Sequence, residues 1–478
     1  MKIRYGLVLT LAMAFGLSAC AGGGASSGGM SPSTSPVIPG GEMLQQGERP
    51  RQNEETRAAE RALDDAEGTD DESQALALYQ QALASAEAAI AADPTNPLAH
   101  RLAAMAAMGV DDYVAAGEHM SRAEELRPIY TLETDGIRER AWIGLYQEAA
   151  PLVNAGDYEG AAAIFEKANA IYDQRPEVMI TLGQIYAQLR EHDKALANLD
   201  RAVEIINSDK AQEMDSVTVA NWQEQGAEIP LLRATVLADA GRFEEAVVAY
   251  RVLVAENPTD IALARNLASM LVQMGNTDEA FQVYDDIMAR PGLTSADYYN
   301  IGVGFYQGSD YERAAQAFGG AATESVNDRD ALEMWARSLQ LDSAYAAVPP
   351  VGERWIALDP NNQNGYLILA QAVNLEGDSD RARELIAAIE AMAVNVSDLQ
   401  ITRLVDGGAQ VSGSVANKTL AEGATVTLTF TFYDEAGTAL GTVDHAVAVG
   451  AEGMAEVFTV EFASMGLVGG YGYTVSAS

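Results

Sequence analysis

The amino-acid sequence predicts a mainly α fold, in which an α-solenoid of about eight helix pairs over residues 56–394 precedes a small all-β sandwich over residues 395–478. Three observations support this prediction. A motif of aromatic and alanine residues returns every 34 residues, and prolines follow several of its copies. Beyond Val394 the apolar residues change from a helical spacing to strict alternation. We therefore expect a helical domain followed by a β domain.

The repeated motif is an aromatic residue, then an alanine, a second large residue and a second alanine at helical spacing. It begins at Tyr158 and at Tyr311, and its register returns at positions 192, 243, 277, 345 and 379. Alanines let two helices approach closely, while the large side chains fill the spaces beside them. Prolines such as Pro128 and Pro258 end second helices, because proline cannot continue a helix. Each copy therefore predicts one pair of packed helices.

The period and the motif resemble the tetratricopeptide repeat family. The family's Leu-Gly-x-x-Tyr pattern stands here as Leu182-Gly183-x-x-Tyr186, and Asp93-Pro94-Thr95-Asn96 matches its linker between repeats. The resemblance implies that the first helices line an inner face that binds peptides or partner proteins. The positions expected on that face are Tyr146, Asn154, Gln184, Gln188, Gln273, Tyr299, Tyr306, Gln307 and Gln371.

Two questions about this face stay open at the level of sequence. Tyrosine, glutamine and asparagine also suit sugars, so the alternative to a protein-binding scaffold is a glycan-binding or polysaccharide-export scaffold. Tyr299 and Tyr306 lie two turns apart and share one helix face. They either point outward as anchors for a partner, or they are partly buried spacers between adjacent repeats.

Two stretches depart from the repeat. Residues 207–226 carry a weak pattern that interrupts the copies without separating domains. In the copy from Arg329 to Asn362, Pro349 and Pro350 stand where the second helix should already be under way. We expect this second helix to start late, because proline is tolerated only in the first turn.

The C-terminal module carries alternating runs separated by turn residues. In the run from Thr425 to Phe432, valine, leucine and phenylalanine occupy one face and the threonines occupy the other. Five similar runs predict six or so antiparallel strands in a β-sandwich. The sequence from Val411 to Asn417, with Phe432-Tyr433-Asp434 and Gly437 after it, resembles the FxLYD domain of bacterial surface proteins, which implies an Ig-like sandwich.

The N-terminus carries the pattern of an export signal. Lys2 and Arg4 precede a short apolar run that ends at Leu17, too short for a transmembrane helix. Leu17-Ser18-Ala19-Cys20 resembles the lipobox of bacterial lipoproteins, which implies cleavage of residues 1–19 and lipidation of Cys20. Residues 20–55 are rich in Gly, Ser and Pro at their start, so we expect a flexible tether.

The composition of the chain argues against several classes of function. The formal net charge is −39 with only 30 Lys and Arg, which disfavours nucleic acid as a partner. Cys20 is the only cysteine, and the four histidines are far apart in sequence without metal-ligand spacing. We therefore expect no metal, no cofactor and no catalytic site.

These features together predict a lipid-anchored scaffold of the cell envelope. Residue 21 is alanine, which in Gram-negative lipoproteins usually means transfer to the outer membrane, and we expect the chain to face the periplasm rather than the cell surface. The expected partners are proteins or peptides on the inner face of the repeats.

Overall fold

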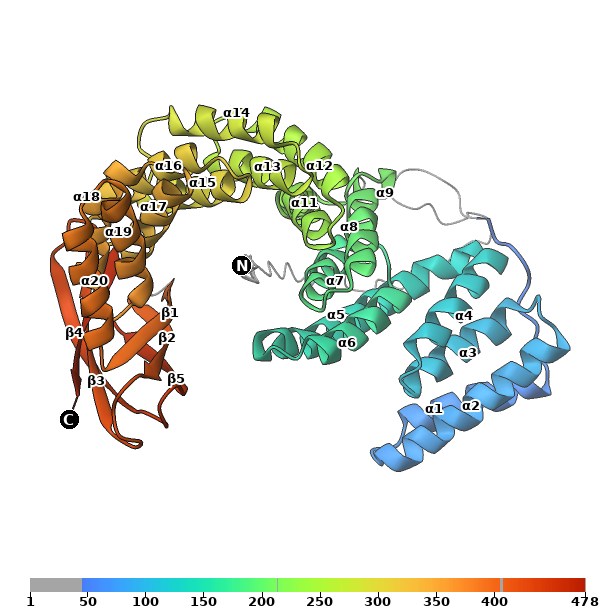
Figure 1. The fold of residues 1–478 in the computed structure, drawn as a ribbon. Helices are drawn as coiled ribbons and strands as arrows, with labels where there is room; N and C mark the ends of the chain where they lie inside the picture. Colours follow the sequence, from blue (N-terminus) through green and yellow to red (C-terminus); the bar gives the residue numbers. More distant parts are fainter. Residues whose placement is uncertain (1–44, 213, 405–406, 478) are drawn as a thin grey trace. The chain divides into compact units, whose positions relative to one another are not determined.

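The structure is a computed structural model that describes residues 45–212, 214–404 and 407–477 (Figure 1). The predicted signal peptide, the lipidated Cys20 and the tether up to residue 44 lie outside these ranges. The chain divides into two compact units, residues 1–245 and residues 246–478. The division falls within helix α12 (Phe243–Glu256) rather than where the helices give way to strands, because the strands pack on helices of the second unit.

The first unit consists of helices that pack mainly on their neighbours in the chain. They are α1 (Glu54–Glu67), α2 (Glu72–Ala92), α3 (Pro97–Gly109), α4 (Tyr113–Leu126), the 3-10 turn η1 (Pro128–Tyr130), α5 (Thr131–Ala155), α6 (Tyr158–Ile171), α7 (Pro176–Gln188), α8 (His192–Ile206), α9 (Asp209–Gln212), α10 (Ser216–Gly226) and α11 (Ile229–Asp239).

The repeat motif forms the core of the helix pairs, as predicted. In α6, Ala161, Phe165 and Ala168 have no exposed surface, and Asp157 caps the helix by accepting from the backbone NH of Gly160. The weak stretch 207–226 is also helical. Trp222 of α10 is buried and donates to Glu177 of α7 at 2.9 Å, so this stretch is fastened to the repeats.

The last part of the predicted tether is bound to the linker between α2 and α3. Arg51 forms an ion pair of 2.9 Å with Asp93, and its backbone NH donates to Oδ1 of Asn96 at 3.1 Å. Asn96 in turn donates to the carbonyl of Arg51 at 2.7 Å. The expectation that residues 20–55 are flexible throughout is therefore corrected for the segment around Arg51, whose backbone finds fixed partners in the linker before α3.

The second unit begins with more helices and continues into the strands. Its helices after α12 are α13 (Ile261–Gln273), α14 (Thr277–Met288), α15 (Ser295–Gln307), α16 (Tyr311–Glu324), α17 (Arg329–Leu341), the 3-10 turn η2 (Tyr345–Ala347), α18 (Val348–Leu358), α19 (Gln363–Leu375) and α20 (Ser379–Ala391).

The late start of one second helix is confirmed. The repeat register places the start of a second helix at Tyr345, yet the chain forms η2 there and α18 begins only at Val348. Pro349 and Pro350 then lie in the first turn of α18, where the missing NH groups have no helical partner to lose.

The strands form a sandwich of two three-stranded antiparallel sheets. They are β1 (Val394–Arg403), β2 (Ala409–Asn417), β3 (Thr425–Tyr433), β4 (Ala439–Ala448), β5 (Ala455–Phe462) and β6 (Gly470–Ala477). One sheet has the order β1-β2-β5 and the other β4-β3-β6. Phe432 of β3 stacks on Phe462 of β5 with ring centroids 4.5 Å apart, so the two sheets share one aromatic core.

Within the second unit the sandwich packs on α17, α18 and the linker before α19 (Figure 1). The backbone NH of Val396 in β1 donates to the carbonyl of Asn361 at 2.8 Å, and that of Val326 donates to Glu435 at 3.2 Å. A Cβ atom on Gly470 would lie 1.9 Å from the carbonyl oxygen of Asn327. Only glycine allows so close a backbone approach.

Candidate functional site

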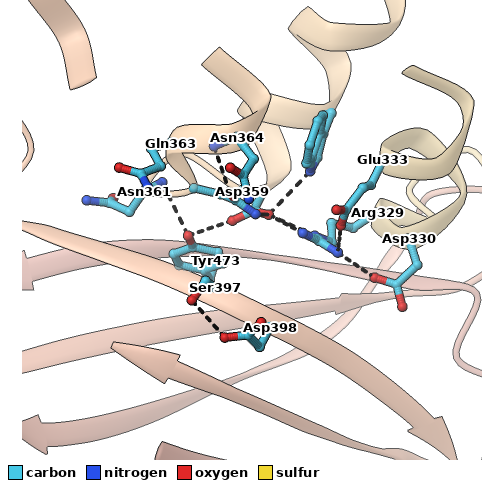
Figure 2. A network of polar contacts seen from close by, with 12 residues as sticks. Arg329, Asp330, Glu333, Asp359, Asn361, Gln363, Asn364, Ser397, Asp398 and Tyr473 are labelled. Atoms are coloured by element: carbon cyan, nitrogen blue, oxygen red, sulfur yellow. Dashed lines mark hydrogen bonds and ion pairs between the residues drawn. The ribbon is translucent and has the colours of Figure 1, made fainter. Parts of the chain in front are cut away.

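A polar cluster joins α17 and the end of α18 to the sandwich (Figure 2). Its centre is the pair of Arg329 at the start of α17 and Asp359 just after α18. Nε and Nη2 of Arg329 lie 2.8 and 2.6 Å from Oδ2 of Asp359, and the two side chains are 2% and 0% exposed. A buried pair of this kind needs further hydrogen bonds to offset the loss of water.

The cluster supplies those bonds. Nη1 of Arg329 lies 2.6 Å from Glu333 and 2.9 Å from Asp330, while Asn362 donates to Asp359 at 2.8 Å. Burial by itself would lower the pKa of Arg329, but Asp359 and the other acidic neighbours raise it well above its ordinary value. Arg329 is therefore charged at all ordinary pH values.

Two tyrosines of β6 complete the cluster. The hydroxyl of Tyr473 donates to Oδ1 of Asp359 at 2.7 Å, and that of Tyr471 donates to Asp330 at 3.2 Å. Burial raises the pKa of both hydroxyls well above the ordinary value, and the adjacent carboxylates raise it further. Because the members of the cluster satisfy one another, we assign the cluster a structural role: it fixes the sandwich to the helices.

A second ion pair extends this junction. Arg403 of β1 lies 3.1 Å from Oδ2 of Asp328 and donates to the carbonyls of Val468 and Gly469 at 2.8 Å each. Burial raises the pKa of Asp328, and Asp330 adds to this rise, whereas Arg403 opposes it. Sequence reasoning missed both pairs. Arg329 begins α17 and Asp359 follows α18, 30 residues later in the same repeat copy, and Arg403 lies in the β module, so no helical spacing places these side chains together.

One of the residues predicted on the first-helix face is buried. Tyr146 is 9% exposed, and its ring lies 5.2 Å from Trp142 and 5.4 Å from Phe165. Tyr146 therefore belongs to the core, which corrects its assignment to a binding face. The sequence showed an aromatic residue at helical spacing, which fits a core position equally well.

Tyr299 is partly buried as well. Its ring meets Phe318 edge-on with centroids 5.3 Å apart, and it packs against the cluster around Trp355. Burial raises the pKa of the Tyr299 hydroxyl, and Asp330 and Asp328 raise it further. These contacts favour the spacer interpretation for Tyr299 over the anchor interpretation.

The other predicted residues reach solvent to different degrees. Tyr306 is half-buried, with its ring 5.4 Å from that of Tyr311, and Gln184 is half-buried too. The exposed ones are Asn154, Gln188, Gln273, Gln307 and Gln371. Asn154, Gln184 and Gln188 belong to the first unit and the others to the second.

Gln371 lies in a groove between α19 and α20. The groove has a volume of about 690 Å³ and is lined by apolar side chains that include Leu367, Ala382 and Ile386. Leu367 is 45% exposed and Ile386 is 38% exposed. Gln371 and Arg383 also line it, so a mostly apolar floor has polar groups beside it. This pattern is typical of a site for another polypeptide.

Two histidines that are far apart in sequence meet in the first unit. Nδ1 of His100 in α3 lies 3.4 Å from Nδ1 of His119 in α4, and Nε2 of His100 lies 3.1 Å from the carbonyl oxygen of Pro94. Burial lowers the pKa of His100, and His119 and Arg122 lower it further, while the Pro94 carbonyl opposes this. Neutral His100 therefore donates from Nε2 and accepts at Nδ1.

Within the described ranges no group of three or more His, Cys, Asp or Glu side chains is arranged to hold a metal ion. No helix in those ranges is both long and apolar enough to cross a membrane.

The sequence of the helical part identifies its repeats. The sequence model of the tetratricopeptide repeat family matches residues 152–213 and 237–300. The chain contains tetratricopeptide repeats. The matched stretches hold α6 to α8 and α12 to α14, whose helix pairs follow the 34-residue register. Repeats of this family imply a scaffold for protein–protein interaction.

Solved structures of other tetratricopeptide proteins are similar to this chain at low identity. The C-terminal part of a repeat-containing protein from Cytophaga hutchinsonii is 18% identical, with 52% of this chain and 94% of that chain covered and a TM-score of 0.41. A protein from Parabacteroides merdae is also 18% identical, with 59% and 99% covered and a TM-score of 0.29. YrrB, a tetratricopeptide protein with an unusual peptide-binding site, is 18% identical, with 40% and 90% covered and a TM-score of 0.29. None of the curated proteins compared with the chain matches it.

Proposed function

We propose that the chain is a scaffold that binds partner proteins through its tetratricopeptide repeats and that it has no catalytic role. The observation that carries this proposal is the groove between α19 and α20, where the apolar side chains of Leu367 and Ile386 remain exposed. Exposed apolar side chains that gather in a groove indicate a binding site for a macromolecule, because a partner would remove their apolar surface from water. Gln371, whose side-chain oxygen accepts from the amide of Gln340, lies beside them and has an NH₂ group for a further hydrogen bond.

The lipid anchor is a second part of the proposal. Leu17-Ser18-Ala19-Cys20 supports cleavage before Cys20 and lipidation of its sulfur. Stable anchoring needs more than one acyl chain, which a lipidated N-terminal cysteine supplies. We propose an outer-membrane lipoprotein that faces the periplasm. Growth with a radioactive fatty acid tests the anchor: the wild-type chain takes up label and Cys20→Ala does not. Label on Cys20→Ala would contradict it.

Binding is tested by affinity capture with the full chain as bait. Membrane extract is passed over the wild-type chain and over Leu367→Glu, which places a charge on the groove. We expect at least one protein to be enriched on the wild type, to bind directly after purification, and to be recovered at least tenfold less on Leu367→Glu. Lack of any enriched protein would contradict the scaffold, and binding on a glycan array instead would favour the polysaccharide alternative.

A further inference from the structure

The groove between α19 and α20 corresponds to the surface between α17 and α18, one repeat earlier, and to the surface between α15 and α16, two repeats earlier. Each counterpart is covered by the first helix of the next pair. A Cβ atom on Gly319 of α16 would lie 3.1 Å from the ring of Trp335 in α17, and one on Gly352 of α18 would lie 3.4 Å from Leu369 in α19. Trp335 and Leu369 are 34 residues apart, so the same register position faces the preceding pair each time.

The positions of α20 that correspond to Gly352 and Gly319 line the open groove. Ile386 lies 34 residues after Gly352, and Ala387 lies 68 residues after Gly319. Both side chains line the groove and are exposed. The position that follows Leu369 by 34 residues is Arg403, which lies in β1 and pairs with Asp328. The chain therefore turns into the sandwich at the point where the next first helix would have covered this surface.

We infer that the groove between α19 and α20 binds an amphipathic helix of a partner protein, in the position that a further first helix would occupy. This inference rests on the proposed scaffold function and names the partner's structure. The groove continues the stacking surface of the repeats, and the helices on that surface show what fits. They present a small residue, a large apolar residue four positions later and a small residue three further on: Ala331, Trp335 and Ser338 in α17, and Gly365, Leu369 and Ala372 in α19.

This pattern has a physical reason. Residues four and three positions apart lie on one helix face, so the three side chains share one stripe. The small residues let the helix axes approach, and the large residue fills the space between the two helices of the preceding pair. Ala331, Gly365 and Ala372 are buried, and Leu369 is only 1% exposed, which shows how closely this stripe packs. Helix-in-groove binding uses the same spacing of anchors.

The test uses the full chain and a synthetic peptide with the sequence of residues 363–375, stapled on its outer face so that it is helical in solution, because short helices are marginal in water. A matched peptide carries aspartate in place of the leucine that corresponds to Leu369. Fluorescence anisotropy measures both peptides against the wild-type chain, Ile386→Glu and the control Leu375→Glu. Leu375 is 54% exposed and does not line the groove.

We expect saturable binding of the leucine peptide to the wild type and to Leu375→Glu, and at least tenfold weaker binding to Ile386→Glu. The aspartate peptide should bind at least tenfold more weakly to the wild type. Lack of saturable binding, or equal binding to all three chains, would overturn the inference. If instead the wild-type chain dimerises in sedimentation and Ile386→Glu does not, with no peptide bound, the occupant is a second copy and the inference is wrong. Proteins captured from membrane extract would in either case still support the scaffold.

Discussion

The hydroxyl of Tyr473, on the last strand, donates a hydrogen bond of 2.7 Å to Oδ1 of Asp359, a carboxylate without exposed surface in the linker before α19. The two residues are 114 positions apart in the sequence. Oδ2 of the same carboxylate accepts from Arg329 and Asn362. One carboxylate thus connects α17, the linker before α19 and the sandwich, so these elements should unfold together.

Tyr473→Phe should lower the free energy of unfolding by about 1–3 kcal/mol, because it leaves Oδ1 of Asp359 buried with one donor fewer. Urea denaturation followed by circular dichroism measures the change. Tyr433→Phe removes a hydroxyl from the same sheet away from the cluster and should leave stability nearly unchanged. Equal stability of the Tyr473→Phe and wild-type chains would show that the bond does not form.

Arg329→Met should cost about 3–5 kcal/mol, because it leaves the carboxylate of Asp359 buried without its charge partner. The matched control is Arg381→Met, which removes an exposed ion pair with Glu384 and should cost less than about 1 kcal/mol. Unfolding by urea should also separate into two transitions in Arg329→Met if the sandwich loses its coupling to the helices. Similar costs for the two variants would contradict a buried pair.

Ala314→Leu should cost about 1–3 kcal/mol, because Ala314 is fully buried where α15 and α16 pack and the site cannot take three more carbons without strain. Ala262→Leu adds the same side chain at an exposed position of α13 and should change stability by less than about 0.5 kcal/mol. Thermal melting compares the two. If Ala314→Leu melts like the wild type, the register of the repeat is wrong.

Helices α3 and α4 should become less stable as the pH falls. The pKa of His100 is lowered in the folded chain by burial, by His119 and by Arg122, so the unfolded chain binds the proton more readily. Folding stability is therefore complete above the unfolded value of about 6.5 and falls as the pH drops below it toward the lowered pKa. Hydrogen exchange of the full chain between pH 7.5 and 5 should show faster exchange in α3 and α4 at the lower pH, after correction for the intrinsic rate. His100→Gln should remove most of this dependence, and its persistence in that variant would assign it to other groups.

The repeats could be predicted from the sequence because the residues of each motif lie close together in the chain. Ala161, Phe165 and Ala168 recur at fixed spacing, and a spacing determines which side chains share a helix face. Pro349 and Pro350 predicted the late start of α18 for an equally local reason, since a proline constrains its own turn.

The contacts between distant segments could not be predicted in this way. Nothing in the spacing of His100 and His119, or of Asp359 and Tyr473, shows that their side chains meet. Tyr146 was misassigned because a first-helix position can turn to the core or to solvent, and only the neighbouring Trp142 and Phe165 decide between them. The open groove could have been found from the register alone, since Ile386 stands at a stacking position after which no further repeat follows.

The most direct test of the scaffold is hydrogen–deuterium exchange of the full chain with and without the protein captured from membrane extract. Binding on the repeats predicts slower exchange in α19 and α20, where the groove lies, with no slowing in strands β3 and β4. Protection confined to the sandwich, or no protection in any helix at saturating partner, would contradict the proposal that the repeats carry the binding surface.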